Sequence, residues 1–290
     1  MINDYYLNIV VMTFLWAALS GCWNMMAGYG GLVSLGQSAF FGIGAYSTAV
    51  LYTTFGLSPW LGMLAGVVVT TSTAVLISWP CFRLRGAFFS LATMVFPIVL
   101  EIVANNWKDV TRGSSGIAMT FKPGLANFMF NSRWAYMAAA FVLMMVVYGI
   151  TRWMHRGRLG LYLLAVRDDQ AAAESMGVEP VKVKLLVTVI SAALTSVGGF
   201  LYAQYILFLD PPSVFSINIS VQIALFSLIG GLGTPLGPIV GSLIMTPLDG
   251  VLSAFLGGGP RLVIYGAVLL GVVLVAPQGV VGAFKARFGK

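Results

Sequence analysis

Charged residues are scarce in this chain. They make up 9% of its 290 residues, against about 25% in an ordinary soluble domain. Hydrophobic residues make up 59%, and the mean hydropathy is +0.92. The apolar runs are too long for transmembrane β-strands, which need about 10 residues, and they suit helices, which need about 20. We therefore predict an all-α, polytopic membrane protein and exclude a soluble globular one.

Residues that commonly hold metals or form disulfides are also few. The chain has two cysteines, Cys22 and Cys81, far apart in sequence, and one histidine, His155, among arginines. This predicts no disulfide framework, no metal site and no cofactor bound by this chain. No H-E-x-x-H or G-x-S-x-G motif is present, and the scattered arginines do not suggest a membrane enzyme. The formal net charge of +7 fits basic cytoplasmic loops better than a nucleic-acid partner.

The phosphate-binding motif GxxxxGK[ST] is absent as well. If the chain works in an ATP-driven system, another chain must bind and hydrolyse ATP with Mg²⁺. No connection between the apolar runs is large enough for a folded soluble domain. We therefore treat residues 1–290 as a single transmembrane domain with a cytoplasmic loop at 152–184.

Apolar runs bounded by charges or turn residues predict about eight or nine transmembrane helices. The amino-terminal run has no Lys or Arg before it, so we interpret it as a retained first helix and not as a signal peptide. The candidate spans are 6–27, 38–55, 59–80, 86–106, 134–153, 184–208, 218–233, 236–256 and 260–277.

Basic residues predict which end of each span faces the cytoplasm. They gather between the third and fourth runs, in the 152–184 loop and in the carboxy-terminal tail. Because basic loops stay on the cytoplasmic side, nine spans would place the amino terminus outside. The 107–133 connection would then be external although it contains four bases, which is the one conflict with this rule.

The most unusual stretch is Gly28–Tyr46, GYGGLVSLGQSAFFGIGAY, which is glycine-rich and uncharged. Backbone that leaves the helical conformation inside a membrane must lie against protein or a water-filled cavity. The stretch therefore predicts a broken helix on a translocation path, with Gly42 and Gly44 allowing close helix contact. The alternative is a cytoplasmic turn followed by a glycine-rich packing face. The candidate path residues here are Gly30, Gly31, Ser34, Gly36, Gln37 and Ser38.

A second insert, GGLGTPLGPIVG at Gly230–Gly241, resembles the first. Interrupted apolar segments in two halves of a chain indicate a transport site, and shared turn chemistry is the alternative. Gly230, Gly231 and Thr234 are the candidates from this segment. Glu101, an ionisable residue within a span, is a further candidate, with a hydrogen bond to a neighbouring helix as the alternative.

The 152–184 loop predicts a short helix. Asp168 or Asp169 can cap its start, good helix formers follow, and Gly177 and Pro180 end it. A short helix on a cytoplasmic loop suits the groove of a partner protein, and a surface helix at the lipid headgroups is the alternative.

This loop resembles the coupling-helix motif Glu-Ala-Ala-x-x-x-Gly of ABC importer permeases. Ala172, Ala173 and Gly177 match the motif, whereas Ala171 stands where the family has an acidic residue. The chain as a whole resembles the branched-chain amino acid permeases of the LivM/LivH type, and the LivM type in particular. The matching stretches are Gly28–Tyr46, Arg83–Phe96, Asn105–Trp107, Thr111–Gly113 with Arg112 in place of a glycine, Gly116–Ile117, Ala165–Val178, Ser191–Ala203 and Gly230–Gly241.

The resemblance implies a permease subunit, not an enzyme, in the bacterial inner membrane. It implies import of branched-chain or other hydrophobic amino acids, with this chain forming half of the path. The implied partners are P-loop ATPase subunits, a second permease, an extracytoplasmic solute-binding protein and membrane lipid. The ATPase-coupling residues would be Asp168, Asp169, Ala172, Ala173, Glu174 and Gly177. The alternatives are a permease for urea or short amides and a self-sufficient secondary transporter or channel.

Overall fold

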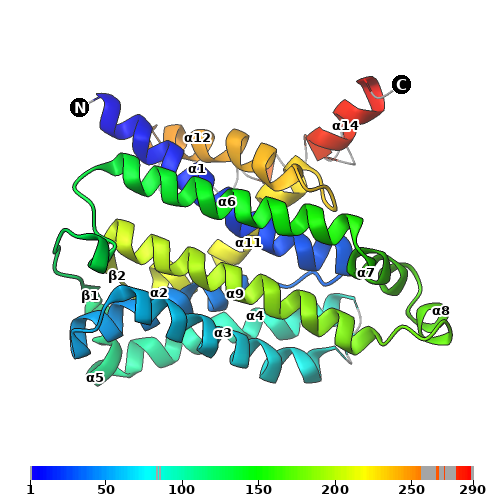
Figure 1. The fold of residues 1–290 in the computed structure, drawn as a ribbon, viewed down its shortest axis with the longest axis horizontal. Coiled ribbons are helices and arrows are strands. Elements are labelled where there is room, and N and C mark those ends of the chain that lie inside the picture. The colour runs from blue at the N-terminus through cyan, green and yellow to red at the C-terminus, as the bar shows by residue number, and fades with distance from the viewer. Residues whose placement is uncertain are drawn as a thin grey trace.

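The chain forms a bundle of long helices whose axes run roughly along one direction (Figure 1). The structure is a computed structural model that describes residues 2–82, 84, 86–255, 266–267, 271 and 279–288. Its long helices are α1 (Ile2–Asn24), α2 (Gln37–Phe55), α3 (Pro59–Cys81), α4 (Ala87–Asn106), α6 (Arg133–Arg156), α9 (Pro180–Ile206), α11 (Ile217–Gly230) and α12 (Gly237–Phe255). The shorter elements are α5 (Lys108–Thr111), β1 (Ile117–Ala118), α7 (Arg158–Asp168), α8 (Gln170–Ser175), β2 (Phe208–Leu209), α10 (Pro211–Phe215) and α14 (Gly279–Phe288).

The all-α, multi-pass architecture is confirmed, but the predicted number of spans is not. Within the described residues, 6 helical segments are long and apolar enough to cross a membrane. Helix α2 is not one of them, because it carries glutamine, serine, threonine and tyrosine among its apolar residues. The predicted span 260–277 lies almost wholly outside the described residues. The apolar run at 218–233 belongs to a longer segment that begins at Pro211 with α10.

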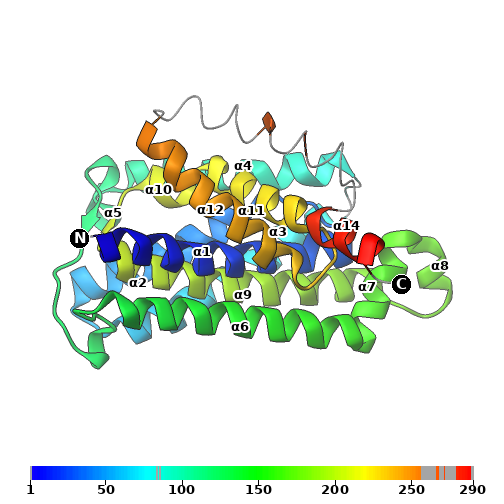
Figure 2. The same cartoon turned by 90° about the horizontal axis from the view of Figure 1, so that it is seen from above.

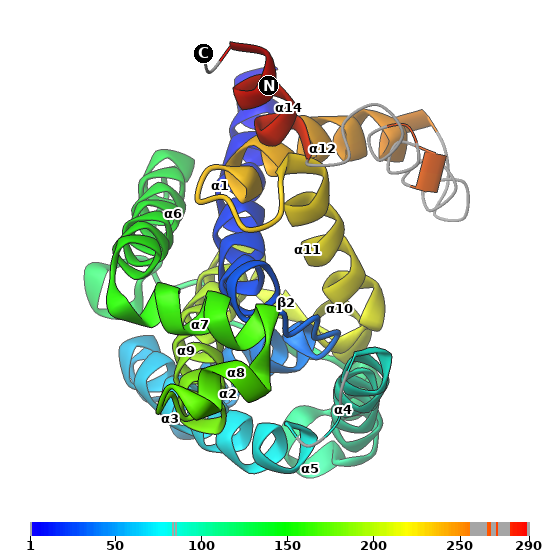
Figure 3. The same ribbon diagram turned by 90° about the vertical axis from the view of Figure 1, so that its right-hand side faces the viewer.

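Helix α1 lies at the centre of the bundle (Figure 3). It packs against α6, α9, α11 and α12, and 72% of its most apolar stretch is buried. Helices α3 and α4 lie at the periphery, where only 28% and 22% of the corresponding stretches are buried. The large side chains of α3 and α4 that face outward are apolar, such as Leu64, Leu76, Phe88 and Ile102. Outward-facing apolar side chains are what a lipid-facing surface requires.

Helices α2, α3 and α9 approach one another through small residues. A side chain added at Gly44 would clash with the backbone of Ser196 on α9, and one at Gly62 would lie 2.7 Å from the Cα atom of Thr48. Gly42 lies directly under the ring of Phe215. The predicted role of Gly42 and Gly44 in close packing is therefore confirmed. Small residues allow such approach between membrane helices.

The connections gather at two opposite ends of the bundle (Figures 1 and 2). One end carries the amino terminus, α5 and the two-stranded antiparallel ribbon in which Ile117 pairs with Leu209. The other end carries α7, α8 and α14. Leu84 and Gly86, from the α3–α4 connection, line a cavity with Arg167 at this second end. Described residues of the three regions that the sequence assigns to the cytoplasm thus lie at the same end of the bundle.

Candidate functional site

The first glycine-rich segment interrupts the helix between α1 and α2. After Asn24, a π-helical turn spans Met25–Tyr29, and regular helix resumes at Gln37. Gly31 has a φ of 66°, a left-handed conformation that glycine adopts without steric cost. A π-turn inserts an extra residue into a helix and is frequent at functional sites. The predicted break in the helix is confirmed.

Side chains from neighbouring helices satisfy the backbone of this segment. The indole nitrogen of Trp23 donates to the main-chain oxygen of Ser34 at 2.6 Å. On α4, Ser90 donates to the Val33 oxygen at 2.6 Å, and Thr93 accepts from the Leu35 nitrogen at 3.2 Å. Ser34 itself accepts from the Gly36 nitrogen at 3.1 Å. These backbone groups of the non-helical segment are therefore paired with protein side chains, as an interruption between membrane helices requires where it lies against protein.

Gln37 and Ser38 begin α2 within a buried polar cluster. The Gln37 amide donates to the hydroxyls of Ser191 and Thr195 on α9, and Ser191 donates to the Cys22 oxygen at 2.7 Å. The main-chain nitrogen of Ser38 donates to Ser220 of α11 at 2.8 Å. Gln37 is fully buried, and its side-chain oxygen has no hydrogen-bond partner among the described residues. The cluster joins α1, α2, α9 and α11 where the helix resumes.

The second glycine-rich segment links α11 to α12. Gly231 and Gly233 have positive φ values of 132° and 75°. The Thr234 hydroxyl donates to the Gly231 oxygen at 2.9 Å and accepts from the Gly237 nitrogen at 3.1 Å, which closes a tight turn. Gly279, the first residue of α14, packs directly against the backbone of Gly231.

The two glycine-rich segments touch each other at Gly28 and Gly233. A Cβ atom on Gly28 would lie 2.5 Å from the Gly233 nitrogen. Asn24, fully buried, joins the two segments, because it accepts from the Gly233 nitrogen at 2.9 Å and donates to the Thr234 oxygen at 2.9 Å. Asn24 is not among the residues predicted from the sequence, although an amide inside an apolar run is a recognisable signal.

The predicted short helix in the 152–184 region is α8. Asp169 is its cap, accepting from the nitrogens of Ala171 and Ala172 at 2.9 and 3.0 Å. Asp168 instead ends α7. Gly177 follows the helix with a φ of 83°. Ala173 is buried and Met176 is 85% exposed. Glu174 accepts from Gln170 at 3.0 Å. The helix is short, capped at both ends, and exposed on one side.

Arg167, at the end of α7, connects this region to the broken helix, and it is not among the residues predicted from the sequence. Its guanidinium donates to the main-chain oxygen of Gly28 at 2.7 Å and forms an ion pair with Asp168 at 3.3 Å. A Cβ atom on Gly31 would lie 2.7 Å from the Arg167 Cγ atom, so the arginine stem occupies the space that this glycine leaves. Arginine near a helix end often binds the unpaired carbonyls there, but no local sequence pattern identifies this partner.

Comparison with known proteins gives the chain's family. Residues 5–276 match the family model described as branched-chain amino acid transport system / permease component. The chain belongs to this family. It is 25% identical over 303 residues to the LivM permease protein of Salmonella typhimurium, covering 96% of this chain and 70% of the relative. It is 25% identical over 297 residues to the Escherichia coli LivH permease protein, covering 95% and 94%. No solved structure matches the chain.

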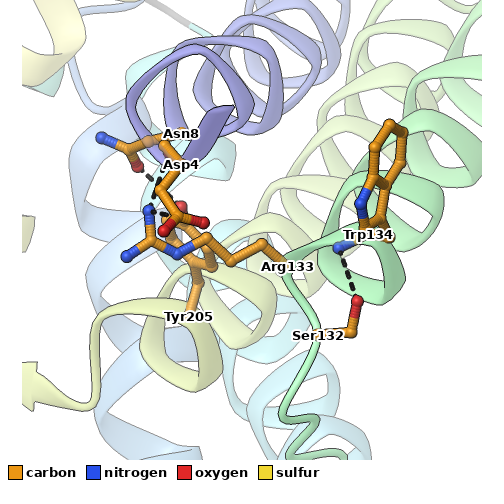
Figure 4. A network of polar contacts seen from close by, with 6 residues as sticks. All are labelled: Asp4, Asn8, Ser132, Arg133, Trp134 and Tyr205. Carbon is orange, nitrogen blue, oxygen red and sulfur yellow. Dashed lines mark hydrogen bonds and ion pairs between the residues drawn. The ribbon is translucent and has the colours of Figure 1, made fainter. Parts of the chain in front are cut away.

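The opposite end of the permease carries its own polar network (Figure 4). Arg133 donates to the main-chain oxygen of Asp4 at 2.8 Å, and the Tyr205 hydroxyl donates to Asn8 at 2.7 Å. Ser132 caps α6 by accepting from the Trp134 nitrogen. Arg133 is one of the four bases that conflict with the predicted sidedness, and its contact with α1 gives it a structural role. A cavity of about 380 Å³ lies beside this network.

Glu101 lies on α4, apart from the glycine-rich segments of the permease. It is half-buried and forms no hydrogen bond or ion pair within the described part of the chain. It lies two turns along α4 from Thr93, the residue that contacts Leu35, which is a separation of about 12 Å along the helix axis. The structure therefore joins the candidates from the two glycine-rich segments and leaves Glu101 outside that group.

Proposed function

We propose that this permease is the transmembrane subunit of an ATP-driven importer for branched-chain or other hydrophobic amino acids. Family membership over residues 5–276 is the observation that carries the proposal. The relatives that support it are permease proteins of high-affinity branched-chain amino acid transport systems. The chain binds and orients no cofactor in this scheme and performs no chemistry on the solute.

The solute path passes beside the two glycine-rich segments. Three observations support this placement: helix is interrupted in both segments, they touch at Gly28 and Gly233, and a buried polar cluster around Gln37 adjoins the first. Polar groups near interrupted helices suit a zwitterionic solute. The side-chain oxygen of Gln37, which has no hydrogen-bond partner among the described residues, supplies an acceptor for the solute's ammonium group when the path opens.

Helix α8 is the docking element for a cytoplasmic P-loop ATPase. Its exposed side, its two caps and its position at the end of the bundle support this role. Asp168, Asp169, Ala172, Ala173, Glu174 and Gly177 form or flank the docking surface. ATP and Mg²⁺ are bound by the partner chain, since this sequence has no phosphate-binding loop. A second permease completes the path, and an extracytoplasmic binding protein delivers the solute in the bacterial inner membrane.

Affinity purification tests the assembly. The chain is purified from its native membrane in mild detergent, and mass spectrometry identifies the co-purifying proteins. We expect a P-loop ATPase and a second permease at stoichiometric levels. A chain that purifies alone and still moves solute in liposomes refutes the proposal and identifies a secondary transporter or channel.

Uptake measurements test the substrate. The assembled system in proteoliposomes is supplied with ATP, the binding protein and either labelled leucine or labelled urea. We expect saturable leucine uptake and no urea uptake. Urea uptake without leucine uptake would assign the permease to the urea and short-amide class instead.

The role of α8 is tested at Gly177. A Cβ atom there meets none of the described residues within 4 Å, so the φ of 83° is the restriction on substitution that the structure shows. Gly177→Val should strain this turn and reduce the amount of ATPase retained on purification, whereas Gly177→Asn, whose side chain tolerates a left-handed conformation, should retain it. Equal retention by both variants and the wild type would remove α8 from the docking role.

A further inference from the structure

Arg167 forms a hydrogen bond to the first glycine-rich segment. No other described side chain from the α7–α8 region does so. Helix α7 packs against α6, α8, α9 and the π-helical turn of α1. Leu163 and Val166 of α7 are buried, and Leu163 lies beside Gly30. Arg167 extends from the same helix to the Gly28 oxygen. The end of α7 is therefore bound both to α8 and to the point where α1 is interrupted.

The carbonyl that Arg167 binds needs a partner from outside its own helix. The last carbonyls of a helix have no intrahelical donor, and the negative end of the helix dipole favours a cation there. A guanidinium donates in a fixed planar geometry, which makes its position sensitive to movement of the helix that carries it. Its stem fits where Gly31 has no side chain, so the arginine holds the segment at two neighbouring points.

The contact continues from Gly28 into the second glycine-rich segment. Gly28 lies against Gly233, and Asn24 binds Gly233 and Thr234 from the same turn of α1. Residues from α7, α1 and the α11–α12 connection thus form one continuous set of close contacts. A cavity of about 230 Å³ lies beside Arg167 and is lined by Gly30, Gly31 and Leu84, among others. This space allows the guanidinium to shift without a clash.

We propose that Arg167 is a positioning residue that transmits movement of the ATPase-docking helix α8 to the two glycine-rich segments. The proposal rests on the proposed function, because it assumes that α8 docks on an ATPase. When the ATPase moves α8, Asp168 and Arg167 move with it. The hydrogen bond from Arg167 to the Gly28 oxygen then lengthens or breaks. Gly31 and Gly233, both in left-handed conformations, provide the backbone freedom for the two segments to respond.

The test compares Arg167→Ala with Arg167→Lys and with Arg158→Ala in the purified, fully assembled transporter. Arg158 is an exposed base on the same helix, and within the described residues its side chain forms no hydrogen bond or ion pair with either glycine-rich segment. Leucine uptake and ATP hydrolysis are measured in the same proteoliposomes. In Arg167→Ala we expect the ATP hydrolysed per leucine transported to rise about tenfold, within the range of typical coupling between sites. Arg167→Lys should recover part of the coupling, and Arg158→Ala should match the wild type.

A parallel fall in uptake and hydrolysis, or no change in either, overturns the proposal. A purely structural role for Arg167 would lower the amount of assembled transporter without changing its coupling ratio.

Hydrogen exchange of the chain in detergent provides a second measurement that does not depend on the ATPase. Arg167→Ala should increase amide exchange in residues 28–36 and 231–237, whereas Arg158→Ala should leave it unchanged. Unchanged exchange in Arg167→Ala overturns the link between α7 and the two segments. If the wild-type chain carries no ATPase, the proposed function fails, and the exchange measurement still decides whether Arg167 holds the segments together.

Discussion

The contact between Gly28 and Gly233 gives the sharpest stability prediction. Replacing Gly28 with alanine adds one methyl group to a fully buried position. That methyl would lie 2.5 Å from the Gly233 nitrogen and 2.8 Å from its Cα atom. Comfortable contact between such atoms begins at about 3.5 Å. The two segments would have to separate by about 1 Å, because backbone atoms on both sides have no rotamer to change.

The magnitude follows from overpacking and from the hydrogen bonds that separation weakens. Inserting a methyl group into a packed core costs about 1–3 kcal/mol. The two bonds from Asn24 would be stretched, at about 0.6 kcal/mol each for polar contacts in membrane proteins. Alanine's usual helical advantage does not offset this, since Gly28 lies in a π-helical turn. We expect Gly28→Ala to lower the free energy of unfolding by about 2–4 kcal/mol.

Gly149→Ala is the matched control. Gly149 lies inside α6, and a Cβ atom there meets no atom of the described part of the chain within 4 Å. Alanine should stabilise this helix by about 0.5–1 kcal/mol. The free energy of unfolding of both variants is measured by titrating dodecyl sulfate into mixed micelles and following the far-ultraviolet circular dichroism. If Gly28→Ala is as stable as the wild type, the two segments are not in contact as described.

Three further substitutions test neighbouring features. Asn24→Ala removes both hydrogen bonds to the second glycine-rich segment, and the same detergent titration should show a loss of about 1–4 kcal/mol in the free energy of unfolding. An unchanged value would contradict the role of Asn24 in joining the two segments. Asp169→Ala removes the cap of α8, which should destabilise that helix by about 1 kcal/mol. Amide hydrogen exchange at residues 171–175 should then accelerate, while exchange in α9 should stay unchanged. Gln37→Met should change stability by less than about 1 kcal/mol, because an acceptor with no partner in the described part of the chain is removed along with two hydrogen bonds. Leucine uptake should nevertheless fall at least tenfold. Normal uptake in Gln37→Met would place the path elsewhere.

Local sequence signals predicted the helices and their interruptions well. The runs at 38–55, 59–80 and 86–106 correspond to helices Gln37–Phe55, Pro59–Cys81 and Ala87–Asn106. Glycine and proline determine such helix boundaries through their own backbone preferences. The residues within a few positions of a boundary are therefore enough to predict it. The short helix α8 was found for the same reason, since its cap and its Gly177 terminus lie within ten residues of each other.

The number of spans and the contacts within the site depend on residues that are far apart in the sequence. Within the described residues, fewer segments are long and apolar enough to cross a membrane than the nine apolar runs of the sequence. Helix α2, which packs against α9 and α3, carries polar residues, and the run at 260–277 lies almost wholly outside the described residues. The Asn24–Gly233 bond joins residues 209 positions apart, and Arg167 lies 139 positions from Gly28. Such pairings depend on how the helices pack, which no local pattern in a single sequence records.

The position of each helix in the bundle has a consequence for mutational tolerance. Among the described spans, the extremes of burial and apolar character are opposed: α4 has the most apolar stretch and is 22% buried, while α1 has the least apolar stretch and is 72% buried. Exchanges among leucine, isoleucine, valine and phenylalanine on the outer face of α4 should therefore change stability and transport very little. In α1 and α2, the same kind of small change alters shape at a packed junction. A saturation scan of this permease would find its most sensitive positions in the helices that a hydropathy plot ranks lowest.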